Sequence, residues 1–434
     1  MPYGQKSVAL AATLILLVSL YYFFGMMIPG MHPGLEARHL AGGYGFGNDL
    51  YPIWLASGEL LHGRNPYSPE LTPRIETGLY GRPLDRSTSS DGSVNMRAFG
   101  YPLYTIFLLA PLTLLSFPVV QVVIAIVLPV VAALCAFLWL RALQMRLSLA
   151  GTIAVIAFAL ASYPVLEGIY AGQPGLLTAA LIAGTIAALV RERYVLAGVL
   201  LPCASIKPQL VLLVAMWLLL WALSNWQQRK NFVFAFFATT TVLLLASALV
   251  LHGWLANWIQ MLFEYRRLSP APLVEFVLGH VAGELVTVFL IGLSSWICWR
   301  SRRQPANSEE FVLCTVFVLA TTAVVLPSTI AVYDQFLLLP AVLWLCERRD
   351  LILRGSFAVR VLALLAIGTV TWQWLAACGL VLTRLIVPAS VHSPKLLLLP
   401  LRTAASVPFA IVALLCFAAV RRMRNDRGSA FDNS

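Results

Sequence analysis

The sequence predicts an all-α polytopic membrane protein, and three features carry that prediction. Of the 434 residues, 60% are hydrophobic and only 11% are charged, and the mean hydropathy is +0.83, whereas a soluble protein carries about a quarter charged residues. Apolar runs of roughly 17–25 residues, each long enough to cross a bilayer as a helix, recur from end to end. These runs lack the period-2 alternation of a membrane β-barrel, so we expect helices that satisfy their own backbone hydrogen bonds.

The distribution of basic residues predicts how the chain is threaded through the membrane. The formal charge is +11, and Lys and Arg clusters in short loops favour the cytoplasmic side. Placing every cluster inside gives both termini in the cytoplasm, a basic tail at 421–434, and one transmembrane domain over 1–434. The first run, Val8 to Pro29, is expected to be a retained helix. About twelve crossings follow, at approximately 8–29, 118–140, 148–166, 174–190, 195–206, 208–224, 231–252, 283–300, 310–326, 333–347, 356–388 and 400–420.

Two longer outer loops are expected, at 30–117 and 253–282. The first contains "GYGFGNDLYPIWLASGELLHGRNPYSPE", which is the densest polar stretch near the start of the chain. Within it "LYPIWLASGELLHG" is typical of an interfacial helix. The apolar segment 101–117 is interrupted by prolines, so we expect it to lie at the outer interface rather than to cross the bilayer.

This topology sends the unusual polar residues to the outer side, while the inner side receives mostly arginines. Such an asymmetry indicates a site that opens outward at the upper ends of several helices. The outer groups are Asp49, Glu59, Arg64 and Tyr67 in the first loop, "EGIYAGQPG" at 167–175, "SIKPQ" at 205–209, "EYRR" at 264–267 and "STIAVYDQ" at 328–335.

Asp49 has two interpretations. It follows Gly47-Asn48, where an Asp suits a turn or a helix N-cap. Alternatively, its carboxylate removes a proton from a hydroxyl nucleophile. Glu59 and Arg64 are second-rank candidates that shape the loop or contact a sugar.

Lys207 also has two interpretations. Its side chain could extend to the membrane interface, or it could bind an anion, because Pro208 starts a helix whose free N–H groups and dipole favour negative charge. A lipid-linked phosphate is the natural anion at that depth. Arg266 and Arg267 either bind the same phosphate or lie among lipid headgroups.

The remaining candidates are neutral or acidic. Gln173 and Gln209 suit hydroxyl groups or loop anchoring, and Asp334 is either an N-cap or a sugar contact. The six histidines form no HxxxH or HExxH pattern, and no P-loop, GxSxG or GxGxxG is present, so neither a metal site nor a cofactor is expected. No basic stripe interleaved with aromatics indicates nucleic-acid binding.

Several of these motifs, in this order, resemble glycosyltransferase family 87 of the GT-C superfamily. "NDLYPIWLASGELLHGRNPY" is similar to its first outer loop, and "YPLY" at 101–104 to its next element, one Pro short. "YAGQPGLL", "AGVLLPCASIKPQLVLL" and "YDQFLLLPAVL" resemble its later motifs. The resemblance covers most of 1–350; the last 80 residues match only as apolar helices.

The resemblance implies a GT-C fold with interfacial helices in the first outer loop and metal-independent transfer from a polyprenyl-phosphate sugar. It implies Asp49 as general base, Lys207 as a phosphate contact, and Asp334 with its neighbour Tyr333 as sugar or acceptor contacts; Tyr67 closes the "G-x-x-P-Y" motif. The best-known relatives are mannosyltransferases.

Our hypothesis is an inverting hexosyltransferase of the bacterial inner membrane with its site on the periplasmic side. It would move mannose to a hydroxyl of a lipid or glycan acceptor. Two alternatives stay open: a transporter or flippase of a lipid-linked glycan, which needs no general base, and a transferase of the same superfamily for another sugar.

Overall fold

A computed structural model describes residues 2–85, 87–88, 91, 94, 97–268, 270–327, 331–386, 394–404 and 406–431. Within these ranges the chain forms helices joined by turns and contains no extended strand, which confirms the all-α class. In the first part of the chain the helices are α1 (Pro2–Leu20), the π-helical η1 (Tyr21–Met27), α2 (Ile28–Glu36), α3 (Tyr51–Leu61), α4 (Leu71–Tyr80), α6 (Tyr104–Leu108), α7 (Ala110–Thr113), α8 (Phe117–Ala142), α9 (Leu149–Leu160), α10 (Tyr163–Ala171), α11 (Pro174–Val190), α12 (Tyr194–Ala204) and α13 (Pro208–Leu223).

The second part continues the bundle. Its helices are α14 (Trp226–Val250), α15 (Trp254–Leu268), α16 (Leu273–Leu278), α17 (His280–Ser301), α18 (Glu309–Val325), the 3-10 helix η2 (Val332–Leu338), α19 (Leu339–Glu347), α20 (Arg349–Leu353), α21 (Phe357–Ile386), α22 (Pro394–Leu397), α23 (Leu399–Ala404) and α24 (Val407–Phe431).

Six helical segments of the described chain are long and apolar enough to cross a membrane, and the bent pair α9–α10 makes a seventh. The protein is therefore a multi-pass membrane protein, while the count of about twelve crossings stays a prediction. α11, α12 and α13 are apolar but shorter. The six long segments are Lys6–Glu36, Phe117–Ala142, Trp226–Val250, His280–Ser301, Phe357–Ile386 and Leu399–Ala419.

Two helix boundaries differ from the prediction, each at a proline. The first helix continues beyond Pro29 to Glu36, and the π-helical turn η1 precedes Pro29 within this continuous segment. The predicted span 148–166 is broken, and α10 turns by 60° from α9. Pro164 explains this break, since it starts α10 and leaves Ser162 extended as the N-cap.

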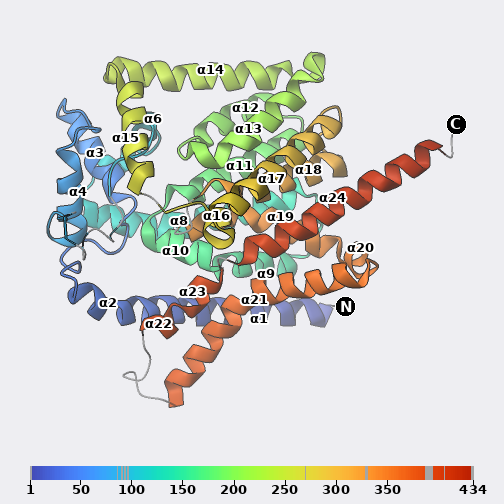
Figure 1. The fold of residues 1–434 in the computed structure, drawn as a ribbon, viewed down its shortest axis with the longest axis horizontal. Helices are drawn as coiled ribbons and strands as arrows, with labels where there is room; N and C mark the ends of the chain where they lie inside the picture. Colours follow the sequence, from blue (N-terminus) through green and yellow to red (C-terminus); the bar gives the residue numbers. More distant parts are fainter. Residues whose placement is uncertain are drawn as a thin grey trace.

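The two ends of the bundle differ in what they carry (Figure 1). α3, α4, α6 and α15 gather at one end of the molecule, whereas the start of α1 and the end of α24 lie at the other. α6 and α7 have five and four residues, too few to cross a bilayer. α24 runs helically through the predicted basic tail as far as Phe431.

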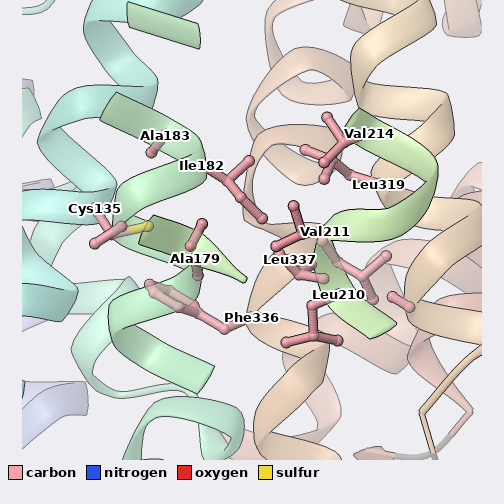
Figure 2. Packing of buried hydrophobic residues seen from close by; sticks show 14 of the residues in the cluster. Cys135, Ala179, Ile182, Ala183, Leu210, Val211, Val214, Leu319, Phe336 and Leu337 are labelled. Carbon is pink, nitrogen blue, oxygen red and sulfur yellow. The ribbon is translucent and has the colours of Figure 1, made fainter. Parts of the chain in front are cut away.

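The core brings the starts of α11 and α13 beside η2 (Figure 2). Side chains of α11, α13 and α18 interdigitate with Phe336 and Leu337 of η2. Alanines on α11 allow close approach, which is how membrane helices pack where lipid offers no hydrophobic contrast. The labelled residues are Cys135 of α8, Ala179, Ile182 and Ala183 of α11, Leu210, Val211 and Val214 of α13, Leu319 of α18, and Phe336 and Leu337 of η2.

Candidate active site

Two Pro-started helices present their N-cap residues at the end of the bundle that carries the first outer loop. Pro174 and Pro208 open α11 and α13, and Gln173 and Lys207 are the residues before them. The helical conformation is disfavoured before proline, and Gln173 and Lys207 both have non-helical backbone angles, which sets both side chains apart from the helices that follow. The motifs "GQP" and "KP" thus position one amide and one cation.

A turn before α3 carries Asp49 and is fixed to the last turn of α10. The N–H groups of Gly47 and Asp49 donate to the carbonyls of Tyr170 and Ala171, both at 2.8 Å. Gly47 and Gly172 both have positive φ, and a Cβ on Gly172 would lie 3.0 Å from the Gly47 Cα. Only glycines allow this approach.

The Asp49 side chain accepts from two residues far away in sequence. The Arg97 guanidinium forms an ion pair with Oδ1, and the Gln173 amide donates to Oδ2. The Asp49 side chain is only 10% exposed. Asp49 is a turn residue but not a cap, since Leu50 is the N-cap of α3. The turn interpretation of its backbone is confirmed, and the capping interpretation is wrong.

Arg97 was not among the predicted residues. Its Nε also donates to the Tyr80 hydroxyl at 3.2 Å. Burial lowers the pKa of Arg97, but the nearby Asp49 carboxylate and Tyr80 outweigh burial and raise the pKa above its usual range. No spacing connects positions 97 and 49; the only sequence signal was that Arg97 lies four residues before "YPLY".

Lys207 and Asp334 form a second, deeply buried pair. Nζ lies 2.9 Å from Oδ1, and the two side chains are 6% and 2% exposed. Nζ also lies 4.5 Å from the centroid of the Tyr333 ring. A Cβ on Gly175 would fall 2.7 Å from the same carboxylate oxygen, so this close contact requires glycine. Lys207 therefore does not extend to the interface, and Asp334 does not cap η2, whose N-cap is Ala331.

The two pairs belong to one site. Asp49 lies within electrostatic range of Asp334, and Glu167 lies within range of both and of Lys207. One Glu167 carboxyl oxygen is buried without a hydrogen-bond partner. Glu167 was inside a quoted motif but not singled out. Tyr101 also lines this region: burial, and then Asp49, raise its pKa well above the usual range.

Glu59 is buried in an ion-pair cluster that ties α3 to α4. Arg64 binds it with two hydrogen bonds of 2.5 and 2.7 Å, and Arg74 reaches it at 2.6 Å. Hydrogen bonds from Arg64 and Arg74 lower the pKa of Glu59 to about 2. Glu59 lies eight residues into α3 from Tyr51, about 12 Å along the axis. This geometry supports loop shaping for Glu59 and Arg64.

The other predicted contacts are distributed around the site. Tyr67 is buried, and its hydroxyl donates to the Tyr101 carbonyl at 2.8 Å. Gln209 and Arg266 are exposed and form no hydrogen bond or ion pair with described residues. The side chain of Arg267 and residues 328–330 of "STIAVYDQ" lie outside the described part. No cluster of three or more metal-ligating side chains occurs among the described residues.

This arrangement can move a proton and hold an anion in the same place. A carboxylate offers about four acceptor positions, so Asp49 keeps room for a hydroxyl beside Arg97 and Gln173. Lys207 supplies an ammonium group next to the N-terminus of α13, which favours negative charge.

A comparison with protein families agrees with this chemistry. The family model described as "Glycosyltransferase family 87" matches residues 99–328, which is more than half of the chain. The match includes Tyr101, Gln173 and Lys207 but not Asp49 or Asp334. No curated protein matches the chain. The chain therefore belongs to glycosyltransferase family 87 and is a membrane glycosyltransferase, which sets the transporter alternative aside.

Proposed function

We propose that this enzyme transfers a hexose, mannose in the first instance, from a polyprenyl monophosphate to an acceptor hydroxyl. The acceptor is a lipid or glycan at the outer face of the bacterial inner membrane. One observation carries the proposal: the Asp49 carboxylate and the Lys207–Asp334 pair, which come from distant segments of the chain, lie within electrostatic range of each other.

The reaction is a single displacement with Asp49 as general base. The acceptor hydroxyl gives its proton to the Asp49 carboxylate as its oxygen attacks the anomeric carbon. The bond from that carbon to the phosphate oxygen breaks, and polyprenyl phosphate leaves with the electron pair, so the anomeric centre inverts. Arg97 and Gln173 hold the carboxylate in place during transfer.

Lys207 stabilises the charge of the leaving phosphate. Its ammonium has three N–H donors, of which one binds Asp334. The remaining donors are suited to phosphate oxygens, and the positive end of the α13 dipole favours the same negative charge. Because Arg266 is exposed, the proposal assigns the phosphate to Lys207 first and leaves Arg266 and Arg267 as outer contacts. Tyr333, Asp334 and Gln173 are assigned to the sugar, and the exposed Gln209 takes no part in catalysis.

The test is the release of free polyprenyl phosphate from a panel of polyprenyl-phosphate hexoses by the purified protein. Removing a positioned base costs about 10²–10⁴ in rate, so Asp49→Asn should lose turnover by that factor while keeping donor binding. The matched control is Asp350→Asn. Asp350 is an exposed carboxylate on α20, so its removal should leave turnover unchanged. If Asp49→Asn turns over at the wild-type rate, Asp49 is not the general base and the proposed mechanism is wrong.

A further inference from the structure

A groove of about 780 Å³ lies between the first outer loop and α15. It is separate from the pairs described above, since none of their residues lines it. Its size falls in the range of small-molecule sites. Its lining residues come from two stretches: Asn65, Tyr67, Ser68, Pro69, Glu70, Thr72, Pro73, Glu76 and Leu84 on one side, and Asn257, Gln260, Met261 and Glu264 on the other.

α15 is amphipathic, and its polar face forms one wall of the groove. Asn257, Gln260 and Glu264 recur at the spacing of one helical face. Leu262 and Phe263 are exposed elsewhere on the helix, as expected of a helix resting on lipid. The groove therefore lies between the polar face of α15 and the first outer loop, while the exposed apolar face of the helix is suited to rest on lipid.

The chemistry of the lining favours hydroxyl groups and disfavours anions. Amide and hydroxyl side chains provide donors and acceptors, and the exposed carboxylates of Glu70 and Glu264 provide strong acceptors, while the buried Glu76 accepts from the Leu84 N–H. No Lys, Arg or His occurs among the described lining residues. A phosphate would be repelled here, so the charged head of the donor belongs with Lys207.

The inner end of the groove abuts the proposed catalytic groups. Tyr67, which lines the groove, donates to the Tyr101 carbonyl at 2.8 Å, and Trp258 of α15 donates to the Gly100 carbonyl at 3.0 Å. Tyr101 lies within electrostatic range of both Asp49 and Asp334. The segment Gly100–Tyr101 thus connects the groove, through Tyr67 and α15, with the proposed catalytic groups.

We infer that this groove binds the acceptor and that the bound part is an uncharged, hydroxyl-rich glycan. The inference rests on the proposed function. An acceptor whose reacting hydroxyl reaches Asp49 extends past Tyr101 into the groove, where amides and carboxylates receive its other hydroxyls. The donor binds on the side of Lys207, so the donor and the acceptor contact different residues and can be bound at the same time.

Binding of defined oligosaccharides to the detergent-purified full chain tests this inference without requiring turnover. The probes are an uncharged mannotriose and a trisaccharide of the same length that contains a hexuronic acid. We expect the wild type to bind the uncharged probe more tightly. The double variant Asn257→Ala/Gln260→Ala should weaken that binding about tenfold, as expected for two lost hydrogen bonds. Leu262→Ala, on the same helix but outside the groove, should leave it unchanged.

A second variant tests the charge argument. Glu70→Gln/Glu264→Gln should raise the affinity for the acidic probe while preserving the melting temperature. Equal binding of both probes by the wild type, no binding of the uncharged probe, or no effect of Asn257→Ala/Gln260→Ala would overturn the inference.

The inference and the proposed function can fail separately. If Asn257→Ala/Gln260→Ala weakens probe binding but the wild type releases no polyprenyl phosphate from any donor, the groove stands and the proposed reaction fails. If donor turnover occurs and this variant leaves the acceptor KM unchanged, the reaction stands and the groove assignment fails.

Discussion

Two buried cations at opposite ends of α13 are held in different ways. Lys207 precedes this helix, which has 16 residues and is about 24 Å long, and Arg229 lies on α14 just beyond its other end. Both residues are at most 5% exposed. Lys207 has a single carboxylate partner and an aromatic face. Arg229 donates to four backbone carbonyls, stacks 3.9 Å from the Trp221 ring, and closes the ends of α13 and α17.

The difference separates a structural cation from one that can exchange partners. The guanidinium of Arg229 satisfies carbonyls that helix ends leave unpaired, and those carbonyls cannot move away. Lys207 is paired with a side chain, Asp334, within range of Asp49 and Glu167. A ligand phosphate can take a place beside such an ammonium without unfolding a helix end.

The largest expected effect comes from Lys207. Lys207→Met leaves the buried Asp334 carboxylate without its cation, and breaking a buried pair in this way costs about 3–5 kcal/mol of stability. The double variant Lys207→Met/Asp334→Asn removes both charges and should recover most of the melting temperature. Its turnover should still fall at least about 100-fold, the usual loss for one charge-stabilising group. Donor turnover and thermal unfolding measure the two effects; recovery of both would show that the pair is only structural.

Arg229→Met should reverse that pattern. Hydrogen bonds to a charged group contribute about 1.5–3 kcal/mol each, so losing those of Arg229 should lower the unfolding free energy by at least the contribution of one such bond. Turnover per folded molecule should change less than about twofold, because Arg229 lies at the other end of α13. Thermal unfolding and turnover at matched folded fraction check this. An unchanged melting temperature would contradict the structural role.

Glu167 sharpens the comparison within the site. One Glu167 carboxyl oxygen has no hydrogen-bond partner among the described residues and is suited to a sugar hydroxyl, so Glu167→Gln should reduce kcat/KM for the donor about tenfold, the value of one hydrogen bond. Glu192→Gln, an exposed residue beyond the far end of α11, is the control. Steady-state kinetics of both variants test this prediction. If Glu167→Gln and Glu192→Gln have identical kcat/KM values for the donor, Glu167 does not contact the substrate.

Glu59 gives the smallest effect and shows that not every ion pair beside the site is catalytic. Its pKa is lowered to about 2 from about 4.5, so its contribution to stability is complete above about pH 4.5 and is lost as the pH falls toward 2. Glu59→Gln should lower the melting temperature by a few degrees at pH 7. At pH 3 the difference in melting temperature between Glu59→Gln and the wild type should be less than half of the difference at pH 7. A difference in melting temperature that does not change with pH would contradict the stabilising ion pairs of Glu59.

Helix class and many helix boundaries were predictable because they depend on local properties. The range 174–190 matches α11, and the predicted 208–224 is one residue longer than α13, since a proline starts each and hydropathy sets the length. The helix predicted for "LYPIWLASGELLHG" is α3, while its place at the membrane interface stays a prediction. Asp49, Gln173, Lys207 and Asp334 were predicted to lie on one side because charge in short loops orients the chain.

Only the tertiary structure decided which of these groups meet. Lys207 and Asp334 are 127 residues apart, and Arg97 and Asp49 are 48 apart; no local pattern encodes such pairs. They form because small residues on α11 let α13 and η2 approach, and because α10 anchors the Asp49 turn. The same packing assigned Glu59 to an ion-pair cluster and revealed Arg97, Glu167 and the groove against α15. The sequence by itself determined the membrane class, because hydropathy is a local property, whereas the packing of the bundle determined which polar side chains form pairs.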